Sequence, residues 1–285
     1  MDSMTVYANA KINLALDVLS KREDGYHNMR MVMQSVSLHD TLTLQFAGEG
    51  LQVKTAARYL PSDDRNLAAK AARFYWKESG IPEEPLTILL EKRIPVCAGT
   101  AGGSSDAAAV LRALNRRYGE PLSENALSDV GEKVGSDVPF CLLGGTALAE
   151  GKGERLTPLP ALPECAIVLC KPDFSVSTPE LFARIQCSKI RKRPDIDGMI
   201  AGLKSGSLSE AARRMYNVFE DSMGERSAAV VRELKSTMIQ SGALGAVMTG
   251  TGPTVFGLFE NQDDAGKAYR VLKERYPDTF LTEPV

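Results

Sequence analysis

A glycine-rich stretch near the middle of the chain has residue types that suit a phosphate-binding loop. It reads PVCAGTAGG from Pro95 to Gly103 and is followed directly by Ser104 and Ser105. Glycine lets backbone N–H groups approach a ligand because no Cβ stands in the way. A helix that begins just after such a loop adds unpaired N–H groups and the positive end of its dipole. This order of residues predicts a bound phosphate group, with Ser104, Ser105 or Asp106 capping the helix.

Two better-known phosphate motifs do not match this loop. A Walker loop needs a lysine directly after its last glycine, and none follows Gly103. A dinucleotide fingerprint needs the spacing GxGxxG, which GTAGG does not provide. A tight strand-to-helix turn without a ligand is therefore the alternative. The paired glycines followed by SSD at a helix start favour the phosphate.

Other side chains that could do chemistry are few and widely spaced. Lys11 lies in a stretch whose alternation indicates a strand, on the face opposite the apolar residues, where a lysine tip is usually solvated. Tyr26 and His27 share a polar turn and could stack on a planar ligand and hydrogen-bond to it, or could be ordinary loop residues. Asp137, in GSDVPF, is either a helix cap or a partly desolvated base. The sequence contains two histidines, His27 and His39. Catalysis must therefore rest on carboxylates, lysines, hydroxyls or one of these two imidazoles.

Apolar periodicity and helix-ending residues outline the elements that hold these side chains. Strands are predicted over 4–19, 31–46, 86–94, 146–150 and 165–170, with two more on either side of a glycine-rich turn over 249–253 and a short last strand. Helices are predicted directly after the loop and over 66–79, 123–134, 195–204, 207–219, 227–240 and 263–276, with one more beginning at Pro179 behind a Thr178 cap. The proline-rich stretch 158–163 separates a predicted domain over 1–157 from one over 164–285.

Composition is typical of an ordinary globular protein. Of the 285 residues, 44% are hydrophobic and 25% are charged, and the net charge of -2 argues against bulk nucleic-acid binding. Five cysteines without a CxxC pair indicate reduced thiols, and two histidines exclude a His-rich metal centre. The sequence shows neither a signal peptide nor an apolar run long enough for a membrane span. We therefore expect a cytoplasmic protein without nucleic-acid or membrane partners.

Three separated segments together resemble the motifs of the GHMP small-molecule kinases. They are AKINLALDV with DGYH near the start, PVCAGTAGGSSDAAAVL in the middle and MTGTGPTVFGLF near the end. More narrowly, DGYH after AKINL, EKRIP, GSDVPF and SVSTPELF resemble the branch that phosphorylates the 2-hydroxyl of 4-diphosphocytidyl-2-C-methyl-D-erythritol in the methylerythritol phosphate route to isoprenoids. The resemblance runs over nearly the whole chain. It implies an α+β fold in two domains, with the active site in the cleft between them.

The resemblance also implies roles for individual residues. Lys11 and Asp137 would be the catalytic pair: Asp137 takes the hydroxyl proton, and Lys11 keeps that carboxylate ionised and stabilises charge on the phosphoryl oxygens. ATP with Mg²⁺ would be the donor, no tightly bound cofactor is expected, and the metal ligands stay open, with Ser105 one possibility. The residues implied for ATP are Pro95, Val96, Cys97, Ala98, Gly99, Thr100, Ala101, Gly102, Gly103, Ser104, Ser105, Asn66 and Lys92. Those implied for the acceptor are Asn13, Tyr26, His27, Thr178 and Phe182, and Gly250 and Gly252 belong to a third-motif loop beside the phosphate loop.

Two residues depart from the family pattern, and two alternatives for the function stay open. Cys97 stands where the family has a small residue, and Thr100 stands where it has leucine. Both differences could change the affinity for the nucleotide. The Cys97 thiol either lies in the positive field of the loop or is buried and inert. A different GHMP kinase would act on homoserine, mevalonate or a sugar, but DGYH and SVSTPELF suit a cytidine site. A non-catalytic paralogue would lack Lys11 or Asp137. We expect a monomer or a weak homodimer.

Overall fold

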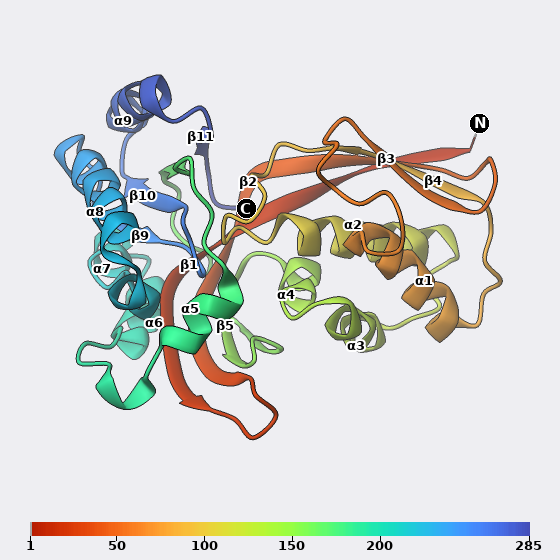
Figure 1. Cartoon of the computed structure of the whole chain (residues 1–285), viewed down its shortest axis with the longest axis horizontal. Coiled ribbons are helices and arrows are strands. Elements are labelled where there is room, and N and C mark those ends of the chain that lie inside the picture. Colours follow the sequence, from red (N-terminus) through yellow and green to blue (C-terminus); the bar gives the residue numbers. More distant parts are fainter. Residues whose placement is uncertain (1) are drawn as a thin grey trace. The chain divides into compact units, whose positions relative to one another are not determined.

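The computed structural model describes residues 2–285, which form two compact units (Figure 1). Unit 1 comprises the residues up to Ala10, His39–Ile94 and Ala101–Leu143, and unit 2 comprises Lys11–Leu38, Pro95–Thr100 and Gly144–Val285. Each unit contains both helices and strands, which confirms the predicted α+β class. The division into domains at 158–163 stays a prediction. Within the described part of the chain, no helix is both long enough and apolar enough to cross a bilayer.

The strands of unit 1 form one twisted layer. They are the first part of β1 (Ser3–Lys21), the second part of β2 (His27–Gln45), β3 (Leu51–Thr55) and β4 (Leu86–Glu91). Their order is β3-β4-β2-β1, with β4 antiparallel to β2 and parallel to β3. The predicted strands over 4–19, 31–46 and 86–94 are confirmed, and β3 was not predicted.

Helices cover one face of this layer (Figure 1). They are α1 (Leu67–Ser79), α2 (Gly102–Arg117), α3 (Glu124–Val134) and α4 (Val138–Leu143). Residues next to the helix ends cap two of them. The Asn66 side chain accepts the N–H of Ala68, Ser123 accepts that of Ala126, and Gly80 ends α1 in a left-handed conformation with φ 70°. The predicted helices 66–79 and 123–134 are therefore confirmed, whereas α4 was not predicted.

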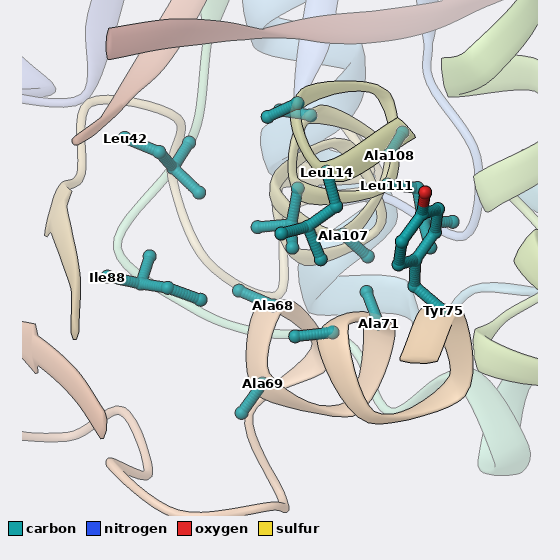
Figure 2. Packing of buried hydrophobic residues seen from close by; sticks show 14 of the residues in the cluster. Leu42, Ala68, Ala69, Ala71, Tyr75, Ile88, Ala107, Ala108, Leu111 and Leu114 are labelled. Carbon is teal, nitrogen blue, oxygen red and sulfur yellow. The ribbon is translucent and has the colours of Figure 1, made fainter. Parts of the chain in front are cut away.

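Small side chains let α1 and α2 pack closely against each other. Figure 2 shows Ala68 and Ala71 of α1 close to Ala107 of α2, with the Tyr75 ring lying beside Leu111. All of these side chains are fully buried. Burying one leucine contributes about 1.5–3 kcal/mol, so this core fixes the helix that follows the glycine-rich loop.

Unit 2 contains the rest of β1 and β2 and a second sheet. β5 (Thr146–Gly151) pairs antiparallel with β2 and with β6 (Arg155–Pro158), and β8 (Tyr216–Asn217) pairs parallel with β1. The second sheet is antiparallel in the order β11-β7-β10-β9, formed by β7 (Ala166–Cys170), β9 (Gly245–Met248), β10 (Val255–Phe259) and β11 (Thr279–Thr282). Its helices are α8 (Glu225–Gln240) and α9 (Gln262–Arg275), which pack against its strands and against each other (Figure 1).

The segment between β7 and α8 differs from the prediction at two places. It holds α5 (Thr178–Arg184), η1 (Cys187–Lys189), α6 (Ile196–Lys204), α7 (Leu208–Ala212), β8 and η2 (Val218–Ser222). The predicted helix 207–219 is confirmed only over Leu208–Ala212, because the chain leaves α7 there and pairs with β1 at Tyr216 and Asn217. Thr178 is the first residue of α5, and its cap is Ser177.

Candidate active site

The glycine-rich loop has an unusual backbone in front of α2. Cys97, Gly99 and Ala101 all have positive φ, at 53°, 75° and 56°. Two of these residues carry a side chain, for which this conformation is strained by about 1–3 kcal/mol. Such strain often accompanies a functional site. Cys97 is exposed, so the alternative in which its thiol is buried and inert is wrong.

The start of α2 carries no capping side chain. The helix begins at Gly102, and its cap residue Ala101 makes no side-chain hydrogen bond to it. Ser104, Ser105 and Asp106 lie inside the helix, so the prediction that one of them is the cap is wrong. The hydroxyl of Ser105 instead donates to the carbonyl oxygen of Asn9. An uncapped helix start after a glycine-rich loop can bind an anion through its backbone N–H groups.

A second glycine loop, between β9 and β10 in unit 2, lies directly against the first. A Cβ added at Gly99 would clash with the carbonyl oxygen of Thr249, and one added at Gly250 would lie 2.9 Å from the carbonyl oxygen of Gly99. Gly250 and Gly252 have φ of 56° and 78°, which glycine adopts at little cost. This close approach requires glycine in both loops.

Lys11 and Asn13 form a buried network with this second loop. The Lys11 Nζ donates to the Asn13 Oδ1 at 2.8 Å, and the Asn13 backbone N–H donates to the Thr249 Oγ1 at 3.0 Å. The Thr249 Oγ1 also lies 3.3 Å from the carbonyl oxygen of Gly99. Lys11 is 4% exposed, so its tip is not solvated as a strand lysine's usually is. The Lys11 N–H donates to the carbonyl oxygen of Thr100, which ties β1 to the phosphate loop.

Among the residues implied for the acceptor, His27 and Phe182 come together. Their ring centroids are 5.0 Å apart, and the Phe182 ring meets the Phe219 ring edge-on at 4.9 Å. Burial, together with the charge of Lys21, lowers the pKa of His27, which keeps the imidazole neutral at pH 7. A neutral imidazole beside an aromatic ring can hydrogen-bond to a planar base that the ring stacks upon.

The other residues implied for the acceptor have separate surroundings in unit 2. Tyr26 is exposed, and the Lys152 Nζ lies 5.5 Å from the centre of its ring. Thr178 is exposed, and its hydroxyl makes a 2.9 Å hydrogen bond with that of Thr251 in the second glycine loop.

Asp137 belongs to unit 1, at the position before α4. Its carbonyl oxygen accepts the N–H of Cys141, and the residue is half-buried. Lys11 belongs to unit 2, so the catalytic pair stays a prediction. Asn66 uses its side chain in two structural bonds: it accepts the N–H of Ala68 at 3.0 Å and donates to the carbonyl oxygen of Pro61 at 2.9 Å. Its role toward ATP also stays a prediction.

Lys92, the other residue implied for the adenosine, lies in a buried charge cluster that was not predicted. Its Nζ donates to the carboxylates of Asp40 and Asp106, the latter at 2.9 Å. The other oxygen of Asp40 accepts the N–H groups of Arg93 and Ile94, just before the phosphate loop. Burial favours a neutral Lys92, but the two carboxylates outweigh it and raise the pKa of this lysine. The cluster thus joins the strand before the loop to the helix after it.

Several important residues carried no recognisable signal in the sequence. Asp40 and Asn217 each act on residues distant along the chain, and single polar residues in strands or turns are common. In the described part of the chain, no group of three or more His, Cys, Asp or Glu side chains could hold a metal ion.

Comparisons with known proteins agree with this architecture. Residues 66–145 match the family model "GHMP kinases N terminal domain", and residues 199–278 match "GHMP kinases C terminal". The chain is 43% identical over 284 residues to 4-diphosphocytidyl-2-C-methyl-D-erythritol kinase of Alkaliphilus metalliredigens, covering 99% of this chain and 97% of that one. It is 44% identical over 280 residues to the protein of that name from Caldicellulosiruptor saccharolyticus, covering 98% and 96%. A crystal structure of 4-(cytidine 5'-diphospho)-2C-methyl-D-erythritol kinase superposes with a TM-score of 0.84 at 34% identity over 99% of both chains. This chain therefore belongs to the GHMP kinase family.

Proposed function

We propose that this kinase transfers the γ-phosphoryl group of ATP to the 2-hydroxyl of 4-diphosphocytidyl-2-C-methyl-D-erythritol, a step of the methylerythritol phosphate route to isoprenoids. The observation that carries the proposal is the 43–44% identity, over nearly the full length of both chains, to kinases named for this acceptor. The contact between His27 and Phe182 supports the same acceptor. Homoserine and mevalonate have no aromatic base that such a pair could hold.

The donor side of the reaction uses the two glycine loops. The uncapped start of α2 and the positive-φ backbone from Cys97 to Ala101 suit the phosphate groups of ATP. Contact between Gly99 and Gly250 supports the phosphate loop from behind. Mg²⁺ enters as part of the ATP substrate and neutralises charge on its phosphates. Phosphoryl transfer needs mainly positioning and electrostatic stabilisation, which these backbone groups provide.

The acceptor side needs a base and a cation. We assign the base to Asp137, which takes the proton of the hydroxyl while the oxygen–phosphorus bond forms. We assign the cation to Lys11, whose ammonium stabilises the charge that develops on the phosphoryl oxygens. The hydrogen bond from Lys11 to Asn13 fixes the direction of that ammonium, and Thr249 in turn fixes Asn13. A buried, oriented charge stabilises a transition state more strongly than a solvated one.

Acceptor-dependent release of ADP tests this proposal. Purified protein is incubated with ATP, Mg²⁺ and either the cytidylyl acceptor, homoserine or mevalonate, and ADP is measured by a coupled assay. We expect release with the cytidylyl acceptor alone. Release with homoserine or mevalonate but not with the cytidylyl acceptor would assign the protein to another GHMP kinase activity. ADP binding without any turnover would identify a non-catalytic nucleotide-binding protein.

A further inference from the structure

Asn217 joins two parts of unit 2 that the proposed function assigns to different substrates. Its side chain is fully buried. The amide nitrogen donates to the carbonyl oxygens of Met248 at 2.7 Å and Gly250 at 2.8 Å. The amide oxygen accepts the N–H of Phe219 at 3.0 Å. Both hydrogens and the oxygen of one side chain are therefore engaged with backbone groups of two separate segments.

The amide nitrogen of Asn217 contacts the second glycine loop, which in turn packs on the phosphate loop. Met248 ends β9, and Gly250 lies in the second glycine loop, so the two donated bonds fix the carbonyl groups with which that loop begins. Gly250 is packed so closely on Gly99 that a Cβ there would lie 2.9 Å from the Gly99 carbonyl oxygen. A shift of the second loop would therefore displace the phosphate loop as well.

The amide oxygen of Asn217 is bonded to the backbone of Phe219, which belongs to a ring cluster with His27 and Phe182. The bond to the Phe219 N–H caps η2 and fixes where the Phe219 side chain leaves the backbone. The buried Phe219 ring meets the Phe182 ring at 4.9 Å and 78°, and the Phe182 ring in turn lies 5.0 Å from that of His27. Phe219 thus supports the pair that receives the acceptor base in the proposed function.

We propose that Asn217 is a positioning residue for both substrates: its amide nitrogen holds the loop behind the phosphate loop, and its amide oxygen holds the ring cluster that receives the acceptor base. The assignment of the two sides to ATP and to a cytidine-bearing acceptor rests on the proposed function. Pairing with β1 at Leu16 places Asn217 where it can reach both segments. Because the two sides use different atoms, one substitution can remove the first and keep the second.

Asn217→Asp separates the two roles. Aspartate keeps an oxygen acceptor for the Phe219 N–H but directs an oxygen, instead of two N–H groups, at the Met248 and Gly250 carbonyls. We expect the KM for ATP and the Kd for ADP to rise at least about tenfold, since two buried acceptors lose their donors. The KM for the acceptor and the Kd for CDP should stay within about threefold of the wild type, because the oxygen-side bond is retained. Asn217→Ala removes both sides and should weaken ADP and CDP alike.

Asn115→Asp is the matched control, because the Nδ2 of this buried asparagine in unit 1 likewise donates to a backbone carbonyl, that of Leu122, at 2.9 Å. It should lower the Tm without changing either KM. If Asn217→Asp does not fold, Asn217→Ser, whose hydroxyl can replace one donor, should give a smaller rise in the Kd for ADP with CDP binding unchanged. An unchanged Kd for ADP in a folded Asn217 variant, or equal weakening of ADP and CDP by Asn217→Asp, would overturn the proposal. Calorimetric titration with ADP and CDP needs no turnover, so it judges Asn217 even if the acceptor assay fails.

Discussion

Asp106→Asn tests whether the buried cluster of Asp40, Lys92 and Asp106 holds one carboxylate more than its lysine can neutralise. Asp106 is 3% exposed, and one of its oxygens lies 2.9 Å from the Lys92 Nζ, which also serves Asp40. Its other oxygen is buried without a hydrogen-bond partner. Burial raises the pKa of Asp106, Lys92 lowers it, and the charge of Asp40 raises it again, from 3.8 to about 7. The folded protein therefore keeps a proton on Asp106 that the unfolded chain has already lost.

The size of the effect follows from the difference between the two pKa values. Between pH 3.8 and about 7, Asp106 is protonated in the folded state and ionised in the unfolded state. Rising pH then lowers the stability of the wild type by at most about 1.4 kcal/mol per pH unit. From pH 5 to pH 7 the loss amounts to about 2.3 kcal/mol, because Asp106 in the folded state is itself half ionised when the pH reaches its pKa of about 7. Lys92 stays charged throughout, because its pKa is raised. Asparagine has no proton to lose, so the stability of Asp106→Asn relative to the wild type should rise by about 2.3 kcal/mol over this interval.

Thermal unfolding at a series of pH values measures this difference. Trp76 is the one tryptophan of the sequence and is buried in unit 1, so its fluorescence reports on the unit that holds the cluster. The expected change corresponds to about 5–10 °C in the difference between the two Tm values. Asp197→Asn is the control. The exposed Asp197 carboxylate is paired with Arg30, whose hydrogen bond lowers the pKa of Asp197. Removing this carboxylate should therefore not increase the stability relative to the wild type as the pH rises. A difference between Asp106→Asn and the wild type that is constant from pH 5 to pH 7 would refute the reasoning.

Three further substitutions or labels test the assigned roles. Asp137→Asn should leave the Kd for ADP and CDP within a few-fold and lower kcat by about 10²–10⁴, the loss typical of a general base; near-normal turnover would remove Asp137 from that role. His27→Ala should weaken CDP binding by about 1–3 kcal/mol and leave ADP binding unchanged, and the opposite pattern would reverse the two sites. Cys97 is exposed, whereas burial raises the pKa of Cys165 to about 12 and that of Cys170 to about 11. Iodoacetamide should therefore label Cys97 first, and bound ATP should slow that labelling. Mass spectrometry measures the labelling rates, and a Cys97 rate that ATP does not change would contradict binding at this loop.

Local signals in the sequence were enough for the elements whose ends are decided by neighbouring residues. Asn66, Ser123 and Gly80 cap or end helices through bonds and backbone angles within a few positions, and those helices lie where predicted. The strand β1 was also predictable from its alternation. The alternation could not indicate that the polar face of this strand is buried as well. Thr249, which bonds to Asn13 on that face, is 236 positions away along the chain.

The parts that were not predicted depend on contacts between distant segments. Asp40 meets Lys92 across 52 positions, and a lone aspartate in a strand carries no mark of its partner. Tyr216 and Asn217 follow α7 closely along the chain, but they pair with β1, a segment about 200 positions earlier, instead of continuing the helix. At the start of α2, three good capping residues follow the glycines, yet the helix begins before them at Gly102. The two glycine loops were recognised from their residues and then by family resemblance, whereas their contact came from the structure.

The interleaved segments of the two units have a consequence for the order in which the chain folds during synthesis. Unit 1 ends at Leu143, so this unit can fold while the ribosome is still adding later residues. The Lys11–Leu38 segment of unit 2 must wait, because β2 pairs with β5 and Val36 bridges to Pro284. β5 follows directly after unit 1, but Val36 lacks its partner Pro284 until the chain is almost complete. Exposed strand edges of this kind promote aggregation, so slow synthesis of the second half should reduce the yield of folded protein more than slow synthesis of the first.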